Sequence, residues 1–213
     1  RRGGPAMNAS RREAMLLGAL PFVAIVVAWA VLPHVVHYPA YMLPPISAVL
    51  QFAWESIEDG SLVRNIAASL ARLAAGFAIG MGLAIPLGLA IAMNRHIADL
   101  FRPLLSFLQA IAGIAWVPLT IIWFGIGNGS VIFVIANTIF FAALYNTVLG
   151  VETIPLALHR AVRSHGGRGF QLVTTLILPG ALVQILLGMR TSLAYGWRAL
   201  VASEMIAGSS GLG

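Results

Sequence analysis

Apolar residues form five long runs along the chain, and shorter polar segments separate them. A helix that crosses a bilayer needs roughly 20 mainly apolar residues, and each run comes close to this length or exceeds it. Runs of this length favour membrane-spanning helices over the strands or helices of a water-soluble domain. The predicted spans cover residues 15–33, 66–93, 104–124, 131–149 and 172–206. The pattern therefore predicts an all-α integral membrane protein, a polytopic helical bundle with five spans in this chain.

The polar segments between the spans differ from one another. Residues 1–14 are basic and are predicted to form a disordered tail, and an amphipathic stretch at 47–57 follows the first span. Residues 94–102 are predicted to form a short loop. Pro155 precedes a short predicted helix, and the glycine pair that begins at Gly166 is expected to end it.

The second apolar run is rich in glycine and alanine. Small residues let helix backbones approach closely in lipid, where burial of apolar surface gives no drive to associate. This run is therefore predicted to pack inside the bundle.

The distribution of charge predicts the orientation of the chain. The tail and the segments 94–102 and 152–169 are basic, whereas 34–64 and 125–130 are acidic or uncharged. Basic segments of membrane proteins collect on the cytoplasmic side. The amino terminus of this multi-pass protein is therefore expected in the cytoplasm. This rule also accounts for the net charge of +6 without a nucleic-acid partner.

Composition excludes several kinds of chemistry. Only 9% of residues are charged, against about 25% in a soluble domain. The chain has no cysteine, and all its 13 basic residues are arginine. It therefore has no disulfide, thiol nucleophile, Schiff-base lysine or Walker-type phosphate loop. No metal-ligand spacing or catalytic triad is recognisable, so we expect a non-enzymatic subunit that binds no cofactor or metal. If ATP drives it, another polypeptide binds the ATP.

Four polar residues inside the predicted spans are candidates for a translocation pathway. A charge at the centre of a span costs roughly 2.5–3.5 kcal/mol on insertion scales. Each of the four residues also allows the alternative that it bonds to a neighbouring helix inside the bundle. Arg72, near the outer end of its span, is expected to snorkel to the surface. The four candidates are Asn137, Arg190, Arg198 and Glu204.

A cytoplasmic motif carries a family resemblance. Arg160, Ala161 and Val162 are followed by Gly166 and then, after nine residues, by Leu-Ile-Leu-Pro at 176–179. This spacing resembles the Glu-Ala-Ala signature of the permeases of bacterial ABC importers. Arg160 stands where the family has Glu, and Val162 stands where it has the second Ala.

Two further stretches are similar to the sulfonate, nitrate and taurine branch of these permeases. Residues 115–127 resemble the third span of the branch, and residues 188–213, with Ala-Ser-Glu at 202–204, resemble its fifth span and following loop. The resemblance covers nearly the whole chain, because earlier residues also fit the pattern: Pro44, Ser69, Leu70, Arg72, Gly76 and Phe77. The branch has a sixth span after this loop, so the sequence is expected to be truncated at Gly213.

The resemblance implies a function and a set of partners. In the bacterial inner membrane, two permease copies would work with two ABC ATPase subunits, which hold ATP and magnesium, and with a periplasmic or lipid-anchored solute-binding protein. Residues 155–169 would form the coupling helix that docks on the ATPase. The solute stays open among sulfonate, taurine, nitrate and a neutral heterocycle. The implied coupling residues are Leu158, His159, Arg160, Ala161, Val162, Arg163, Ser164, His165, Gly166 and Arg168.

Other functions remain alternatives at this point. The coupling segment has the composition of a juxtamembrane loop whose arginines hold anionic headgroups. A secondary transporter or channel subunit would work without an ATPase, although no inverted repeat is visible. A membrane scaffold would have no transport role.

Overall fold

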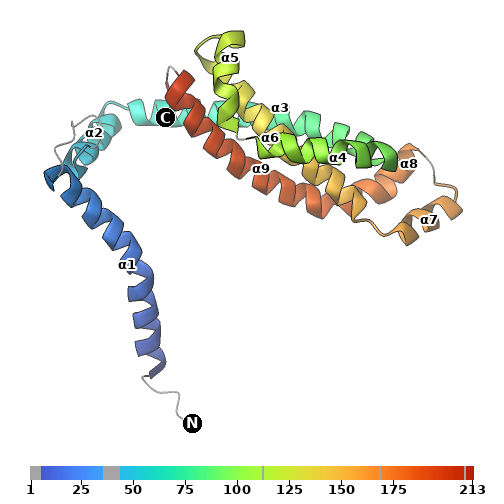
Figure 1. Cartoon of the computed structure of the whole chain (residues 1–213), viewed down its shortest axis with the longest axis horizontal. Helices are drawn as coiled ribbons and strands as arrows, with labels where there is room; N and C mark the ends of the chain where they lie inside the picture. The colour runs from blue at the N-terminus through green and yellow to red at the C-terminus, as the bar shows by residue number, and fades with distance from the viewer. Residues whose placement is uncertain (1–5, 36–43, 112, 168, 209) are drawn as a thin grey trace. The chain divides into compact units, whose positions relative to one another are not determined.

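The computed structural model describes residues 6–35, 44–111, 113–167, 169–208 and 210–213. Every regular element in these ranges is helical, as predicted for an all-α protein. The chain forms two compact units, residues 1–62 and 63–213 (Figure 1). The candidate sites all lie in the second unit.

The first unit contains two helices, α1 (Ala6–Val35) and α2 (Ile46–Glu58). Helix α1 includes residues 6–14, so the disordered tail predicted there is replaced by helix from residue 6 onwards. Helix α2 confirms the amphipathic stretch predicted at 47–57. Within this helix, Trp54 Nε1 donates a hydrogen bond to Glu58 Oε1 at 2.7 Å, which connects two side chains one turn apart.

The second unit is built around long helices (Figure 1). Helix α3 begins in the first unit, and its residues from Val63 onwards belong to the second. The elements are α3 (Ser61–Ala92), α4 (Arg95–Ala110), η1 (Gly113–Trp116), α5 (Val117–Phe124), α6 (Asn128–Glu152), α7 (Leu156–Ser164), α8 (Phe170–Leu172), the π-helical turn η2 (Val173–Ile177) and α9 (Leu178–Ala207).

Three helical segments of the described chain are long and apolar enough to cross a membrane. They are α3, α6 and the continuous segment Val173–Ala207. A fourth crossing is counted if α4 and the η1–α5 segment, which are bent by 85° relative to each other, form one broken span. The predicted span at 104–124 therefore does not run as one continuous helix, because the chain turns near Ile111.

The prediction of a loop at 94–102 is wrong. Residues from Arg95 onwards are helical, and the Asn94 side chain caps this helix by accepting a hydrogen bond from His96 N at 3.0 Å. An Asn at this position satisfies a backbone donor that the first helical turn leaves free. The charged residues of this segment therefore lie on an amphipathic helix rather than in a loop.

Helix α6 lies at the centre of the second unit. On one side, Gly76 and Gly80 of α3 face Ile135 and Ile139, and a Cβ built at Gly80 would lie 2.8 Å from the carbonyl oxygen of Ala136. The glycine-rich face of α3 is thus in backbone contact with α6, which confirms the predicted packing of this run inside the bundle.

Helix α9 packs on α6 through glycines in the same way. A Cβ at Gly188 would lie 2.7 Å from Cβ of Asn146, and one at Gly196 would lie 2.7 Å from Cδ1 of Ile139. Thirteen of the 25 residues of α6 are buried as a result. Helix α6 is therefore packed closely against α3 on one side and against α9 on the other.

Candidate functional site

Helix α7 begins and ends where the motif predicts. Pro155 is its N-cap residue, and Gly166 follows its last turn with φ of +84°, a left-handed conformation that favours glycine. Gly167 N donates to Val162 O at 3.0 Å, and Gly166 N donates to Arg163 O at 3.1 Å. These bonds satisfy carbonyl groups that the end of a helix leaves free.

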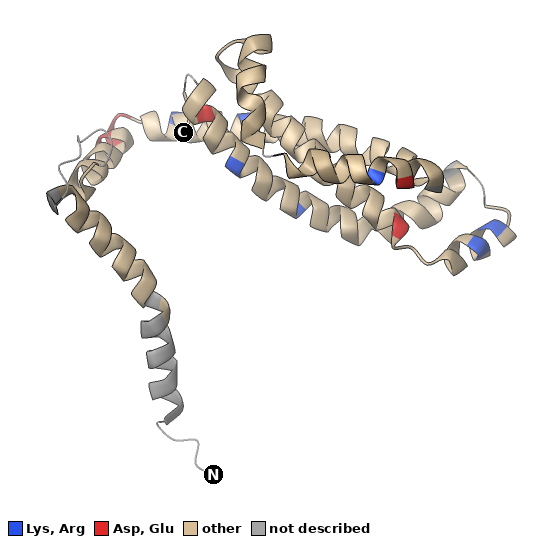
Figure 2. Cartoon of the chain, viewed as in Figure 1, with Lys and Arg blue, Asp and Glu red and all other residues tan. Residues whose placement is uncertain are grey.

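The surface of α7 is basic and exposed. None of its residues is buried, and the exposed fractions of Leu156 and Leu158 are 60% and 49%. Arg160 and Arg163 are also exposed, and Figure 2 shows basic residues on this helix. Exposed leucines beside arginines can contact a protein surface that has apolar pockets and acidic groups.

The remaining residues of the predicted coupling set have different exposures. Val162 is partly buried and packs against a cluster of apolar residues that includes Leu172 and Leu176. His159 is partly buried, and its Nδ1 atom has no hydrogen-bond partner. Ala161, Ser164, His165 and Gly166 are exposed. Arg168 lies outside the described residues.

An ion pair lies just before α7. Arg102 of α4 donates through Nη2 to Glu152 Oε2, at the last residue of α6. Only three residues, 153–155, separate Glu152 from α7. This pair therefore joins α4 to the end of the helix that leads into α7. The sequence places the two residues 50 positions apart and contains no local signal for the contact.

Two of the four predicted pathway residues line one cavity, and the other two do not. The cavity has a volume of about 420 Å³ and lies between α4, η1, α6 and α9. Asn137 and Arg198 line it, whereas Arg190 is exposed elsewhere on α9. The Arg198 guanidinium lies 5.4 Å from the centre of the Tyr195 ring. The sequence analysis missed Tyr195, although its spacing of three from Arg198 on a helix would have indicated the contact.

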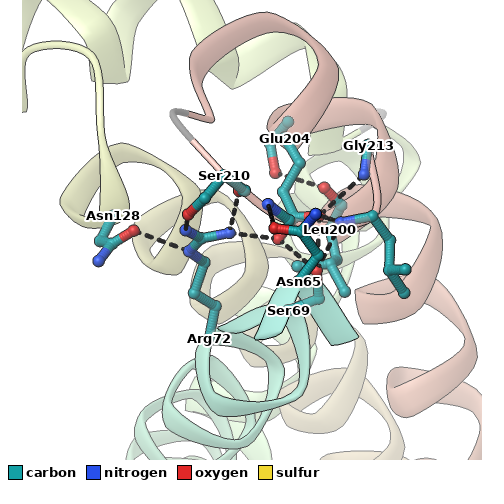
Figure 3. A network of polar contacts seen from close by, with 11 residues as sticks. Asn65, Ser69, Arg72, Asn128, Leu200, Glu204, Ser210 and Gly213 are labelled. Carbon is teal, nitrogen blue, oxygen red and sulfur yellow. Dashed lines mark hydrogen bonds and ion pairs between the residues drawn. The ribbon is translucent and has the colours of Figure 1, made fainter. Parts of the chain in front are cut away.

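Glu204, the fourth predicted pathway residue, lies in a buried polar network (Figure 3). Arg72 Nη1 donates to Glu204 Oε1 at 2.5 Å, and both residues are 4% exposed. The Ser69 hydroxyl donates to the same carboxylate at 2.8 Å. The prediction that Arg72 snorkels to the surface is wrong, because a buried acid from α9 satisfies it. For Glu204, the geometry supports the alternative of a bond to a neighbouring helix.

The chain after α9 folds back onto this ion pair. Leu212 N and Gly213 N donate to Glu204 Oε2 at 3.0 and 3.2 Å. Arg72 Nη2 donates to the Ser210 hydroxyl at 2.8 Å, and Arg72 Nε donates to Asn128 Oδ1 at 2.8 Å. Both oxygens of the carboxylate and all three guanidinium nitrogens therefore have partners (Figure 3).

Comparison with known proteins gives a consistent result. The chain matches the family described as "Binding-protein-dependent transport system inner membrane component" over residues 84–213. It is 33% identical to the taurine transport system permease protein TauC of Escherichia coli, over 96% of this chain and 75% of that protein. It is 36% identical to the putative aliphatic sulfonates transport permease protein SsuC of the same species, over 90% and 73%.

A third relative has a different named substrate. The riboflavin transport system permease protein RibX of Chloroflexus aurantiacus is 38% identical, over 83% of this chain and 66% of that protein. The relatives thus share a permease function in their names and differ in the solute. The resemblance inferred from the cytoplasmic motif is confirmed: this chain belongs to the binding-protein-dependent transport system inner membrane component family and is a transmembrane ABC transporter permease.

Proposed function

We propose that this permease forms the solute pathway of an ATP-driven importer and that α7 is its contact with the ATPase. Two copies would assemble with two ABC ATPase subunits, which carry ATP and magnesium, and with an external solute-binding protein. The amino terminus and α7 would face the cytoplasm. The observation that carries the proposal is the position of α7, an exposed basic helix inserted between α6 and α9 of the packed core.

The connections of α7 suit a mechanical role. Three residues join it to α6, and a glycine turn leads from it to α8 and α9. Because α6 and α9 pack closely through glycines, a displacement of α7 would act on both helices together. ATP binding would draw the two α7 helices towards each other and open the pathway outward, and hydrolysis would reset it. The two binding events are then thermodynamically linked. ATP raises the affinity of the permease for the binding protein by the same factor as docked binding protein raises the affinity for ATP.

The basic surface of α7 predicts an acidic partner. Arg160 replaces the glutamate of the family signature, so the facing groove of this ATPase would carry a complementary acid. The substitution Arg160→Glu is expected to weaken association with the ATPase, measured by co-purification. Tighter association of this variant would overturn the idea of an acidic groove.

The solute is proposed to be a small anion, such as a sulfonate, taurine or nitrate. The named substrates of TauC and SsuC support this class, and so do the arginines 190 and 198 on α9. Arg190, Arg198 and Asn137 would border the pathway, whereas the external binding protein would set most of the selectivity.

The test is reconstitution of the complete transporter in liposomes. We expect ATP-dependent uptake, and ATP hydrolysis that rises when binding protein and solute are added. Charge reversal on α7 by Arg163→Glu should abolish both effects, while Arg64→Glu, at an exposed arginine of α3, serves as the matched control. Solute flux without ATP would favour a secondary transporter or channel. If variants with Arg163→Glu or with a substitution at Gly166 assembled normally and took up solute normally, α7 would have no role in transport.

A further inference from the structure

Two cavities lie next to each other in the second unit. The first is the cavity of about 420 Å³ between α4, η1, α6 and α9. The second has a volume of about 330 Å³ and is lined by Ser106, Gln109, Ala110, Tyr145 and Tyr195. The two linings share Gln109 of α4 and Tyr195 of α9. These two side chains therefore lie at the boundary between the cavities.

The second cavity is displaced towards the α7 end of the bundle. On α6, which ends just before α7, Tyr145 of the second cavity follows Ala142 of the first. On α9, which runs away from α7, Tyr195 precedes the other residues that line the first cavity. On α4, whose ion pair with the end of α6 fixes the same direction, Ser106 of the second cavity precedes Leu108 of the first. Since α7 is proposed to face the cytoplasm, the first is the outer cavity and the second is the inner cavity.

The boundary lies at the depth of the membrane. Helix α9 continues for 17 residues before Tyr195 and for 12 residues after it, so this residue is near the middle of a predicted crossing. Gln109, Asn137 and Tyr145 bring amide and hydroxyl groups to the same two cavities. Polar side chains at this depth usually face protein or a water-filled cavity and not lipid. The face that carries the two cavities therefore suits a solute pathway.

Tyr195 supplies the bulk at the boundary. Its side chain belongs to both linings and is accessible, because the residue is 40% exposed. The next residues of α9 that line the outer cavity after Arg198 are small, Ala199 and Ala202. A tyrosine ring is rigid and large, and it places a hydroxyl at its tip. An alanine at position 195 would remove this ring and join the two cavities.

We propose that Tyr195, with Gln109 opposite it on α4, closes the pathway between the outer and inner cavities in the nucleotide-free transporter. The ring of Tyr195 fills the passage, and the same residues of the second copy complete the closure. This inference rests on the proposed transport function and names the residues that keep its pathway tight. Closure by side chains is compatible with the close packing of α6 and α9, because it needs no sliding of these helices.

The first experiment measures leakage through the complete permease–ATPase complex in liposomes, without ATP or binding protein. The liposomes contain a dye that iodide quenches, and iodide entry is followed by fluorescence. Tyr195→Ala should raise the entry rate about tenfold or more, because an open polar passage conducts small ions. Tyr195→Phe should stay as tight as the wild type, since the ring remains. Trp197→Ala is the matched control: this aromatic residue lies on the same helix, is 41% exposed and is outside both linings.

The second experiment uses the absence of cysteine from the chain, so that one introduced thiol is the only one in the permease. Ser106→Cys places it in the inner cavity and Asn137→Cys in the outer cavity. In inside-out membrane vesicles, which expose the ATPase side, a membrane-impermeant thiol reagent is added and the mass of the permease is measured. We expect modification of Ser106→Cys but not of Asn137→Cys. Addition of Tyr195→Ala should make Asn137→Cys react.

Three results would overturn the closure by Tyr195. They are a Tyr195→Ala complex as tight as the wild type, an equal leak in Tyr195→Phe or Trp197→Ala, and modification of Asn137→Cys from the ATPase side while Tyr195 is intact. ATP-driven uptake by the wild-type complex, with binding protein and solute, tests the transport function separately. Normal uptake with a tight Tyr195→Ala complex refutes the closure alone. Absent uptake with a leak specific to Tyr195→Ala refutes the transport function alone.

Discussion

The Arg72 guanidinium and the Glu204 carboxylate form a buried ion pair in which Nη1 and Oε1 lie 2.5 Å apart. The pair joins α3 to the end of α9, across 132 positions of sequence. The remaining hydrogen bonds come from Ser69, Asn128, the hydroxyl and carbonyl groups of Ser210, and the backbone N–H groups of Leu212 and Gly213. A buried pair with every polar atom satisfied is tolerated at low dielectric, whereas a single unpaired charge is not.

Loss of one partner of this pair should destabilise the protein strongly. For Glu204→Gln, which leaves the Arg72 charge buried without a counter-ion, we expect a loss of about 3–5 kcal/mol. The measurement is the unfolding transition of the purified permease in detergent. The double variant Arg72→Gln/Glu204→Gln should recover part of the loss, because no charge is then left unpaired. A double variant less stable than both single variants would contradict this account.

The ion pair between Arg102 and Glu152 should behave differently. The Arg102 side chain is 52% exposed, and exposed pairs contribute about 0–1 kcal/mol because water and salt screen them. Arg102→Gln should therefore change the unfolding transition much less than Glu204→Gln. Raising the salt concentration should remove any remaining difference between the unfolding transitions of the wild type and Arg102→Gln. A large loss of stability that does not depend on salt would contradict this expectation, because it would show that water and salt do not screen the pair.

The contact between α3 and α6 should be sensitive to a single methyl group. Gly80→Ala would place a Cβ 2.8 Å from the carbonyl oxygen of Ala136, and such overpacking costs about 1–3 kcal/mol. Gly82→Ala is the matched control, because nothing lies within 4 Å of a Cβ at that position. We expect a lower unfolding temperature for Gly80→Ala, and an unchanged or slightly higher one for Gly82→Ala. Equal transitions in the two variants would contradict the backbone contact.

The end of α7 should require a residue that accepts a left-handed conformation. Gly166 has φ of +84°, and an ordinary side chain there costs about 1–2 kcal/mol. Gly166→Val should therefore loosen the last turn of α7 and weaken association with the ATPase in co-purification. Gly166→Asn should retain most of the association, since Asn tolerates this conformation. Equal loss in both variants would point to a role of glycine other than backbone conformation.

Local sequence signals predicted much of the fold. Apolar length located α3, α6 and α9, and the composition of α3 predicted its close packing. Pro155 and Gly166 predicted the two ends of α7, because a proline or a glycine determines the conformation of its own backbone whatever the rest of the fold is. The bend near Ile111 was missed because the apolar pattern continues through it. The helical start at Arg95 was missed because its charged residues resemble a loop, although Asn94 is a good cap.

Contacts between distant residues were beyond the sequence analysis. Arg72 was assigned to the surface because it lies near the outer end of its predicted span, whereas its partner comes from the far end of α9. Arg198 and Asn137 were both chosen as polar residues inside spans, yet nothing in their spacing showed that they border the same cavity. Such pairings depend on which helix faces pack together, and a single sequence does not contain that information.

The glycine contacts on the two sides of α6 limit how this permease can change shape. With the α3 and α9 backbones against the central helix, a sliding or rotation of one helix past another would drive main-chain atoms into side chains. Residues 63–213 should therefore respond to the ATPase as one rigid body. Alternating access would then arise by rocking between whole subunits, and the hinge would lie outside each packed core.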